Sequence, residues 1–451
     1  MNRFASPLLI VVAASCPATG QDTTLGRSEK NAVVQNIGDM LTVNYVFPDR
    51  AAVAKAKIAS ELAAGDYDDV VDPSIFAQRL TADLQSVTHD RHMRVFTGDG
   101  QRPPADLQPP PPSNAGFARV DLLTGNIGYI KLLGFPPPGP FDLVAAQALA
   151  DLAGTDALII DMRDNDGGSP ASVAYLCSFF FDPKTPVHLN DLIYRKPGTT
   201  EFTTKEFWTK AVNTSYLNKP VYLLTSKRTF SGGEEFVNDL KAQKRAKLFG
   251  DTTGGGANPG NVLPIGTRFS VFIPSGRAEN PVTRTSWEGT GVTPDVTVNE
   301  KQALQAAIAD IRGGTYDAAA AAVKMNPTAE NDEDAFVEAH LLKFRTTPLS
   351  GGAEAVRRAL EELARGAPNY DRMAPDLADA TREQLPSLQP GIRGLGAVKT
   401  VTFNRVDPDG LDVYDVTLAN GALQCGIFVA PDGKVVSAWM HMETNRTPVT
   451  H

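Results

Sequence analysis

A serine that is followed by two glycines and two glutamates has the setting that a nucleophile requires. Ser231 lies in Thr229-Phe230-Ser231-Gly232-Gly233-Glu234-Glu235, directly after an apolar run at 221–224 and before an amphipathic stretch. A strand that runs into a sharp turn and a helix would fix the hydroxyl and aim helix N–H groups at a developing negative charge. Ser231 with Glu234 also fits a capping box, in which the serine only begins the helix.

A second glycine turn could supply an oxyanion hole. Residues 157–163 are typical of a buried strand, and they run into Asp164-Asn165-Asp166-Gly167-Gly168 and a helix-prone stretch. Glycine N–H groups at the carboxyl end of a strand are open to a substrate carbonyl, because no side chain shields them. We therefore expect Gly167 or Gly168, together with the N–H of Gly232, to hold an oxyanion. A plain strand–helix connection has the same pattern.

Five motifs, taken in order along the chain, resemble peptidase family S41. This family includes the carboxyl-terminal processing proteases, the tricorn core protease and the repeats of the interphotoreceptor retinoid-binding protein. The resemblance covers about residues 30–298 and implies a ClpP- and crotonase-like α/β core that acts through an acyl-enzyme, with Ser231 as its nucleophile. The matching segments are 128–132, 159–168, 225–235, 250–256 and 287–295.

The general base is expected to be a histidine. The Ser-Lys branch of the family carries a lysine where this chain has Thr252, and a threonine cannot accept a proton near neutral pH. His92 follows a helical stretch, and the tricorn-like and retinoid-binding branches have a histidine at this junction. An imidazole can take the serine proton and return it to a leaving group. His89, three residues earlier on what we expect to be the same helix face, is the second candidate.

An acidic residue should orient that histidine. Glu288 matches an acidic member of the tricorn catalytic tetrad, and Asp90 is the other acid near the ring; a surface carboxylate is the alternative interpretation of Glu288. The tetrad also has a serine directly before its histidine. Arg91 takes that position here, so the relay cannot be copied intact.

Two further patterns limit the ligands that the chain could bind. The glycine loop with Gly254 and Gly255 lacks the Lys-Ser or Lys-Thr ending of a phosphate-binding loop, so we expect it to edge the substrate cleft. His89 and His92 have no third ligand at a suitable spacing, so neither a metal nor another cofactor is expected.

Length and patterning predict several domains. The chain has 451 residues, of which 42% are hydrophobic. We expect an N-terminal helical domain and, after a stiff proline-rich linker, an α/β catalytic core and a C-terminal α+β domain that resembles cystatin- or NTF2-like sheets. In the last domain, helices are expected at 318–323, 335–342 and 353–364, before four strands. The expected boundaries are 25–96 for the helical domain, 97–118 for the linker, 119–313 for the catalytic core and 318–448 for the C-terminal domain.

The first twenty residues are typical of an export signal. Arg3 precedes an apolar run at 7–14, and small residues at 18–20 fit a cleavage site, so a periplasmic or extracellular protein is expected. Cys16 follows Ala13-Ala14-Ser15, a weak lipobox that would instead tether the chain to a membrane. The other two cysteines, Cys177 and Cys425, are expected to be buried free thiols.

The function that these patterns favour is an exported serine peptidase acting on peptide or protein substrates, with an assembly of identical copies left open. The formal net charge of −9 and the lack of a basic patch argue against nucleic acid. Two alternatives remain: a serine esterase, and a carrier of apolar ligands such as retinoids or lipids, because Arg91 breaks the tetrad.

Overall fold

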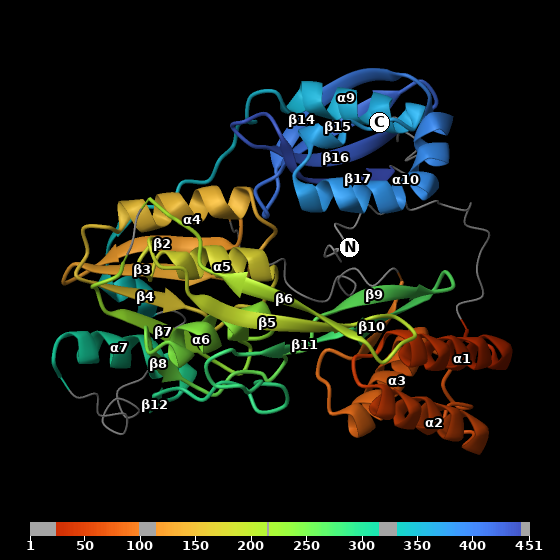
Figure 1. Ribbon diagram of the computed structural model, residues 1–451, viewed down its shortest axis with the longest axis horizontal. Coiled ribbons are helices and arrows are strands. Elements are labelled where there is room, and N and C mark those ends of the chain that lie inside the picture. The colour runs from red at the N-terminus through yellow and green to blue at the C-terminus, as the bar shows by residue number, and fades with distance from the viewer. Residues whose placement is uncertain (1–23, 99–113, 214–215, 315–331, 443–451) are drawn as a thin grey trace, which may run out of the picture.

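The computed structural model describes residues 24–98, 114–213, 216–314 and 332–442, and Figure 1 shows how their helices and strands are arranged. The predicted export signal, Cys16, residues 99–113 of the predicted linker and the helix expected at 318–323 lie outside these residues. In the described part of the chain, no helix has both the length and the apolar character needed to cross a bilayer.

A seven-stranded sheet forms the centre of the molecule, in the order β12-β8-β7-β4-β3-β2-β13. The strands from β12 to β3 are parallel, whereas β2 and β13 are antiparallel additions at one edge. Strands with few polar residues are typical of a sheet that is covered on both faces. The strands are β2 Phe117–Leu123, β3 Ile127–Leu132, β4 Ala157–Asp161, β7 Val221–Thr225, β8 Lys247–Gly250, β12 Val296–Thr297 and β13 Val337–His340.

Helices cover both faces of this sheet. Because side chains alternate along a strand, Leu158 and Ile160 pack in the apolar cluster with α4, α5 and α6, whereas Ile159 packs in the cluster with α7. The strand predicted at 157–163 is confirmed over residues 157–161, and the strand predicted at 221–224 and the helix predicted after each strand are confirmed. The helices are α4 Pro140–Asp151, α5 Pro170–Ser178, α6 Gly232–Ala242 and α7 Ala303–Ile311.

The N-terminal helices share their core with a small antiparallel sheet of order β1-β10-β9. Leu41 and Phe76 from the helices lie in one buried cluster with Phe269 and Val271 from β10. This shared core fixes the turn after α3 against a sheet that residues far along the chain supply. The elements are α1 Arg27–Asn44, α2 Pro48–Ala64, α3 Pro73–Thr88, β1 Arg94–Thr97, β9 Gly260–Ile265 and β10 Phe269–Pro274.

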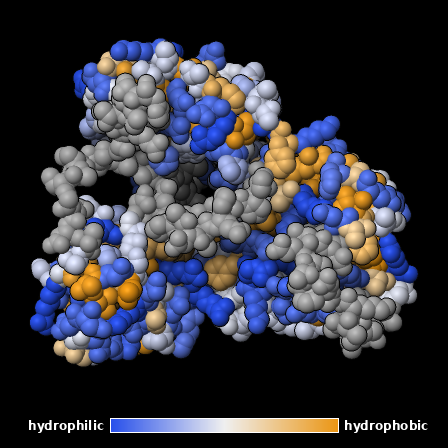
Figure 2. Space-filling model, turned by 180° about the vertical axis from the view of Figure 1, so that it is seen from behind, coloured by the Kyte–Doolittle hydropathy of each residue, from blue (hydrophilic) through white to orange (hydrophobic). Residues whose placement is uncertain are grey.

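A third sheet, of order β11-β5-β6, lies beside the small one in Figure 1. Its strands are β5 His188–Arg195, β6 Phe202–Trp208 and β11 Gly276–Glu279. The surface seen from the other side in Figure 2 mixes polar and apolar side chains, with apolar groups both on the lobe of the N-terminal helices and on the lobe of the central sheet. Exposed apolar residues of these helices include Val43, Val53 and Ile75.

The C-terminal part packs α9 and α10 against a four-stranded antiparallel sheet. The four predicted strands and the helix predicted at 353–364 are confirmed, whereas the likeness to cystatin or NTF2 folds stays a prediction. Helix α10 contains Pro386 and Pro390, residues that normally argue against a helix interior, and its sequence did not predict it. The elements are α9 Gly352–Arg365, α10 Pro375–Leu395, β14 Val398–Val406, β15 Asp412–Leu418, β16 Gly421–Val429 and β17 Val435–Met442.

One helix prediction in this part is wrong. Residues 335–342, expected to be helical, end a short 3₁₀ turn and then form β13, which pairs with β2 at the edge of the central sheet. Hydrogen bonds to the open edge of β2 outweigh the helix propensity of this alanine- and glutamate-containing segment.

The C-terminal sheet contacts the core at the loop between β3 and α4. Gly139 has a φ of 108°, and a Cβ added there would lie 2.8 Å from a ring carbon of Phe428. The hydroxyl of Ser437 also donates a hydrogen bond to the Pro138 carbonyl at 3.3 Å. Glycine is therefore needed at position 139 both for its backbone conformation and for this close contact.

Candidate active site

Ser231 occupies a strained turn between β7 and α6. Its φ of 52° and ψ of −122° form a combination that residues with a side chain rarely adopt. Two backbone hydrogen bonds hold the turn: Phe230 N–H donates to the Asn165 carbonyl, and Gly254 N–H donates to the Thr229 carbonyl, both at 2.9 Å. The serine is half-buried, directly before the first residue of the helix. This is the strand–turn–helix placement that the sequence predicted.

The predicted glycine turn lies against this corner. Gly167 and Gly168 have φ values of 102° and 135°. A Cβ added at Gly167 would lie 2.7 Å from both Ser231 Cβ and Gly232 N, and one added at Gly232 would lie 3.0 Å from Gly168 N. Only glycines allow the two strand ends to approach so closely.

The N–H groups of these glycines are used differently. Gly167 N–H donates to the Asn165 side-chain oxygen at 3.0 Å. Among the described residues, the N–H groups of Gly168 and Gly232 donate no hydrogen bond. Gly168 and Gly232 thus have adjacent free donors beside Ser231, whereas Gly167 contributes space.

Glu234 fixes the glycine loop to the serine turn, a role that the sequence did not predict. Its Oε1 accepts hydrogen bonds from Thr253 Oγ1 at 2.5 Å and from Gly255 N–H at 2.6 Å. Its Oε2 accepts from Gly256 N–H at 2.7 Å and from Ser231 N–H at 3.1 Å. Burial raises the pKa of this carboxyl, and the four hydrogen bonds oppose that effect. The capping-box spacing was a signal for the Ser231 contact, but not for the loop.

His92 reaches the same corner from the turn after α3. Its ring lies 4.6 Å from the Phe230 ring and 5.6 Å from the Phe272 ring, measured between centroids. A Cβ added at Gly256 would lie 2.8 Å from His92 Cε1, so the glycine loop touches the imidazole as well. The histidine therefore contacts the residue that precedes Ser231.

Burial, with a smaller effect of the Arg94 charge, lowers the pKa of His92 to about 4. The ring is consequently neutral near pH 7, which is the form that a base requires. In the described part of the chain neither ring nitrogen has a hydrogen-bond partner, and Nδ1 is buried. Catalytic hydrogen bonds are often long without substrate, so this geometry is compatible with a base.

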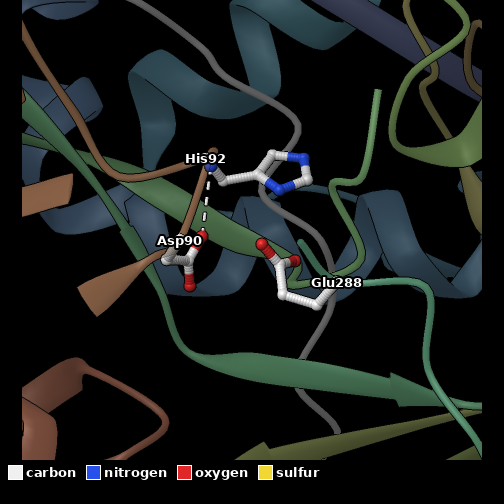
Figure 3. Close-up of side chains that lie close together, drawn as sticks. All are labelled: Asp90, His92 and Glu288. Atoms are coloured by element: carbon white, nitrogen blue, oxygen red, sulfur yellow. Dashed lines mark hydrogen bonds between the residues drawn. The ribbon is translucent and has the colours of Figure 1, made fainter. Parts of the chain in front are cut away.

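Two carboxylates lie beside the imidazole, as Figure 3 shows. The potential ligand atoms of Asp90, His92 and Glu288 lie within 4.8 Å of one another. In the figure, the Glu288 carboxylate comes from a separate segment and faces the ring, whereas Asp90 lies on the turn of His92 itself. Burial and the Asp90 charge raise the pKa of Glu288 to about 7.

Each carboxylate is held by hydrogen-bond donors. Asp90 Oδ1 accepts from His92 N–H at 3.1 Å, and Oδ2 accepts from Asn258 Nδ2 at 2.8 Å and Tyr45 Oη at 3.2 Å. Glu288 Oε2 accepts from Ala257 N–H at 2.6 Å, and Oε1 accepts from Arg91 N–H at 3.4 Å. Nothing in the sequence pattern indicated Tyr45 or Asn258, because they join Asp90 only through the fold.

Among the residues that the structure describes, two groups of side chains have the composition of a metal site. They are Asp90 with His92 and Glu288, and, on the β5–β6 hairpin, His188 with Asp191 and Glu206. In the first group every carboxylate oxygen already accepts an N–H or O–H donor. That arrangement suits acids that position an imidazole better than acids that bind an ion.

The structure overturns one expectation about this turn and adds contacts for Arg91. His89 is exposed at the C-cap of α3 with a φ of 55°, so it does not share a helix face with His92, and the prediction that it does is wrong. The Arg91 guanidinium donates a hydrogen bond to the Gly254 carbonyl. The residue in the place of the tetrad serine thus contacts Glu288 through its backbone N–H alone and turns its side chain to the glycine loop.

Comparison with known proteins identifies the family. Residues 126–298 match the model of peptidase family S41, and residues 21–116 match that of the N-terminal domain of this peptidase in eukaryotic IRBP. Carboxyl-terminal-processing peptidase 2, chloroplastic, from Arabidopsis thaliana is 29% identical over 176 residues, which are 38% of this chain and 31% of that protein. The match thus spans about a third of the length of this relative.

Among solved structures, the photosystem II D1 C-terminal processing protease is 14% identical and superposes with a TM-score of 0.40, over 61% of this chain and 94% of its own. A lipoprotein from Streptococcus agalactiae is 14% identical with a TM-score of 0.42, over 64% of this chain and 98% of its own. The family models, which match the segments that build the serine corner and the histidine turn, show that the chain belongs to peptidase family S41.

Proposed function

We propose that this protein is a serine peptidase that hydrolyses peptide bonds in peptide or protein substrates through an acyl-enzyme. The observation that carries the proposal is the strained Ser231 turn, with two free glycine N–H groups beside it and a neutral, enclosed His92 ring against Phe230. Family membership supports a peptidase. No cofactor enters the proposed reaction.

In the proposed reaction Ser231 Oγ attacks the substrate carbonyl while His92 takes the hydroxyl proton. The N–H groups of Gly168 and Gly232 stabilise the oxyanion of the tetrahedral intermediate. His92 then gives the proton to the leaving amine. Water, deprotonated by the same imidazole, hydrolyses the ester that joins the acyl group to Ser231.

Glu288 is proposed to orient His92 and to stabilise the imidazolium that forms during the reaction. Its carboxylate faces the ring, and the Ala257 and Arg91 N–H groups hold it there. This arrangement does without the serine of the tricorn tetrad. Gly254 and Gly255 are proposed to line the edge of the substrate cleft.

The place of action and the domain organisation are also proposals. The pattern of residues 1–20 supports export, and the separate apolar clusters of the central sheet and of the C-terminal sheet support two independent cores there. The N-terminal helices, by contrast, share a cluster with β9 and β10, so we propose that they fold together with the core.

A fluorophosphonate probe tests the nucleophile directly. We expect purified wild-type protein to gain the mass of one probe adduct, located at Ser231 by peptide mapping, and Ser231→Ala to gain none. No labelling of well-folded wild-type protein would contradict the proposal and favour the carrier of apolar ligands. Turnover of a peptide library, compared with matched esters, separates a peptidase from an esterase.

A further inference from the structure

A cavity of about 450 Å³ lies where the C-terminal part meets the core, on elements that contribute nothing to the serine site. Its wall comes from α4, α9 and the segment between β16 and β17, and its volume is in the range of small-molecule sites. Leu143 of α4 is 46% exposed at this place, which is unusual for a large apolar side chain. The apolar part of the wall includes Leu143, Leu349, Val429 and Pro431.

Two arginines are among the residues that line the same cavity. Arg358 comes from α9 and Arg372 from the 3₁₀ helix Tyr370–Arg372. Within the described residues neither guanidinium forms an ion pair or a hydrogen bond, whereas Arg345 pairs with Asp412 in the same part of the chain. Glu354 is the acid in the lining, so the cavity has an excess of positive charge next to an apolar wall.

We propose that this cavity binds a carboxylate that is joined to an apolar group. A planar guanidinium donates two parallel hydrogen bonds to a carboxylate, and the neighbouring apolar wall would cover an aliphatic or aromatic side chain. The free carboxyl end of a peptide whose last residue is apolar has this chemistry, and so has a fatty acid. The proposal does not depend on Ser231 being a nucleophile.

The position of the cavity gives the bound ligand a structural effect. Val429 directly follows Phe428, which packs on Gly139, and Leu143 lies one helical turn after that glycine. A ligand that contacts both Val429 and Leu143 would therefore stabilise the packing of the C-terminal sheet against the core. Because a ligand that binds only the folded state stabilises it, the melting temperature should rise with ligand concentration.

Calorimetric titration of the full chain carrying Ser231→Ala measures binding without any turnover. The probes are acetyl-Ala-Leu with a free carboxyl end, the same dipeptide as its amide, and decanoate. We expect the free acid to bind at least about tenfold more tightly than the amide, since the amide cannot take a charge-assisted bidentate bond. Binding of decanoate without binding of the dipeptide acid would assign the site to fatty acids.

Arg358→Gln with Arg372→Gln should weaken binding of the free acid by at least about tenfold and should remove the rise in melting temperature. Arg365→Gln, on the same helix but outside the cavity, is the matched control and should bind as the parent does. Equal affinity for acid and amide, unchanged affinity in the double variant, or no binding of either acid would overturn the proposal. A circular dichroism spectrum unchanged in the double variant excludes misfolding as the cause of weak binding.

Discussion

The two sides of the candidate site are built in different ways. The serine side consists of backbone: two strand ends of one sheet, three glycines and a helix start, all in contact at distances that only glycine permits. The histidine side consists of side chains from a turn and two loops, held by hydrogen bonds to Tyr45, Asn258 and Ala257. The backbone geometry of the serine side is therefore set by the fold, whereas the histidine side can be changed one side chain at a time.

Removing the imidazole should have the largest effect on the histidine side. We expect His92→Ala to lower the rate of fluorophosphonate labelling by about 100- to 10,000-fold, the contribution of a general base. His89→Ala, which changes an exposed histidine at the end of α3, is the matched control and should label at the wild-type rate. Equal losses in both variants would show that the base is not assigned correctly.

The backbone of the serine side is held in place by the side chain of Glu234. The substitution Glu234→Gln tests how much the serine turn depends on this carboxylate. The amide keeps one acceptor oxygen but points an NH₂ group at backbone N–H groups that now donate to a carboxylate. We expect the free energy of unfolding to fall by about 2 kcal/mol and the labelling rate to fall with it. Chemical denaturation measures the first quantity; an unchanged midpoint would mean that the glycine loop holds the turn without Glu234.

The pH dependence of labelling should report Glu288 rather than His92. Since the pKa of His92 is lowered to about 4, its ring is already neutral well below pH 7. The pKa of Glu288 is raised to about 7, so the charge that stabilises an imidazolium appears as the pH rises through 7. The rate in wild-type protein should rise there, and Glu288→Gln should lose the rise and be about tenfold slower at pH 8. A rise centred near pH 4 or 6.5 would exclude this role.

Glu235 is a buried acid on the helix that follows Ser231, and its ionisation can be tested by measuring the stability of the fold. Burial raises the pKa of Glu235 to about 7, and this carboxyl sits on α6 near Asp239 and Cys177, whose pKa values are also raised by burial. A raised pKa stabilises the fold fully below the pKa of the unfolded chain, and this contribution is lost as the pH rises through the folded value.

We therefore expect Glu235→Gln to match the wild type at pH 4 and to be more stable at pH 8, by on the order of 1–3 kcal/mol. Urea unfolding at both pH values measures the difference. Glu361→Gln, on the exposed side of α9, should show no such change with pH. A difference of equal size at pH 4 and pH 8 would mean that packing, and not ionisation, is the cause.

The sequence predicted the serine side almost completely, because its signals are local. An apolar run, a glycine turn and a helix-prone stretch follow one another at both 157–168 and 221–235, and the fold places the two glycine turns together. Even so, the local pattern did not show whether Gly167 or Gly168 has the free N–H group for an oxyanion. The answer depends on the Asn165 side chain, which accepts a hydrogen bond from Gly167 N–H.

The histidine side was predicted by resemblance and only in part. His92 and Glu288 are 196 positions apart, and no periodicity links them; the contact exists because β1 pairs with β10 and because the loop after β11 returns to the turn. Tyr45 and Asn258, which hold Asp90, had no signal at all. Likewise β13 and α10 were missed because sheet-edge pairing and tertiary packing outweighed propensity.

The distribution of the candidate site along the chain also has a consequence for biosynthesis. During translation the histidine leaves the ribosome first, the serine follows, and the glutamate comes last, after β10 and β11 have been made. A nascent chain that ends before β10 has the serine but neither the strand against which the histidine turn packs nor Glu288. The order of synthesis would thereby delay the proposed hydrolysis until the last part of the candidate site has been made.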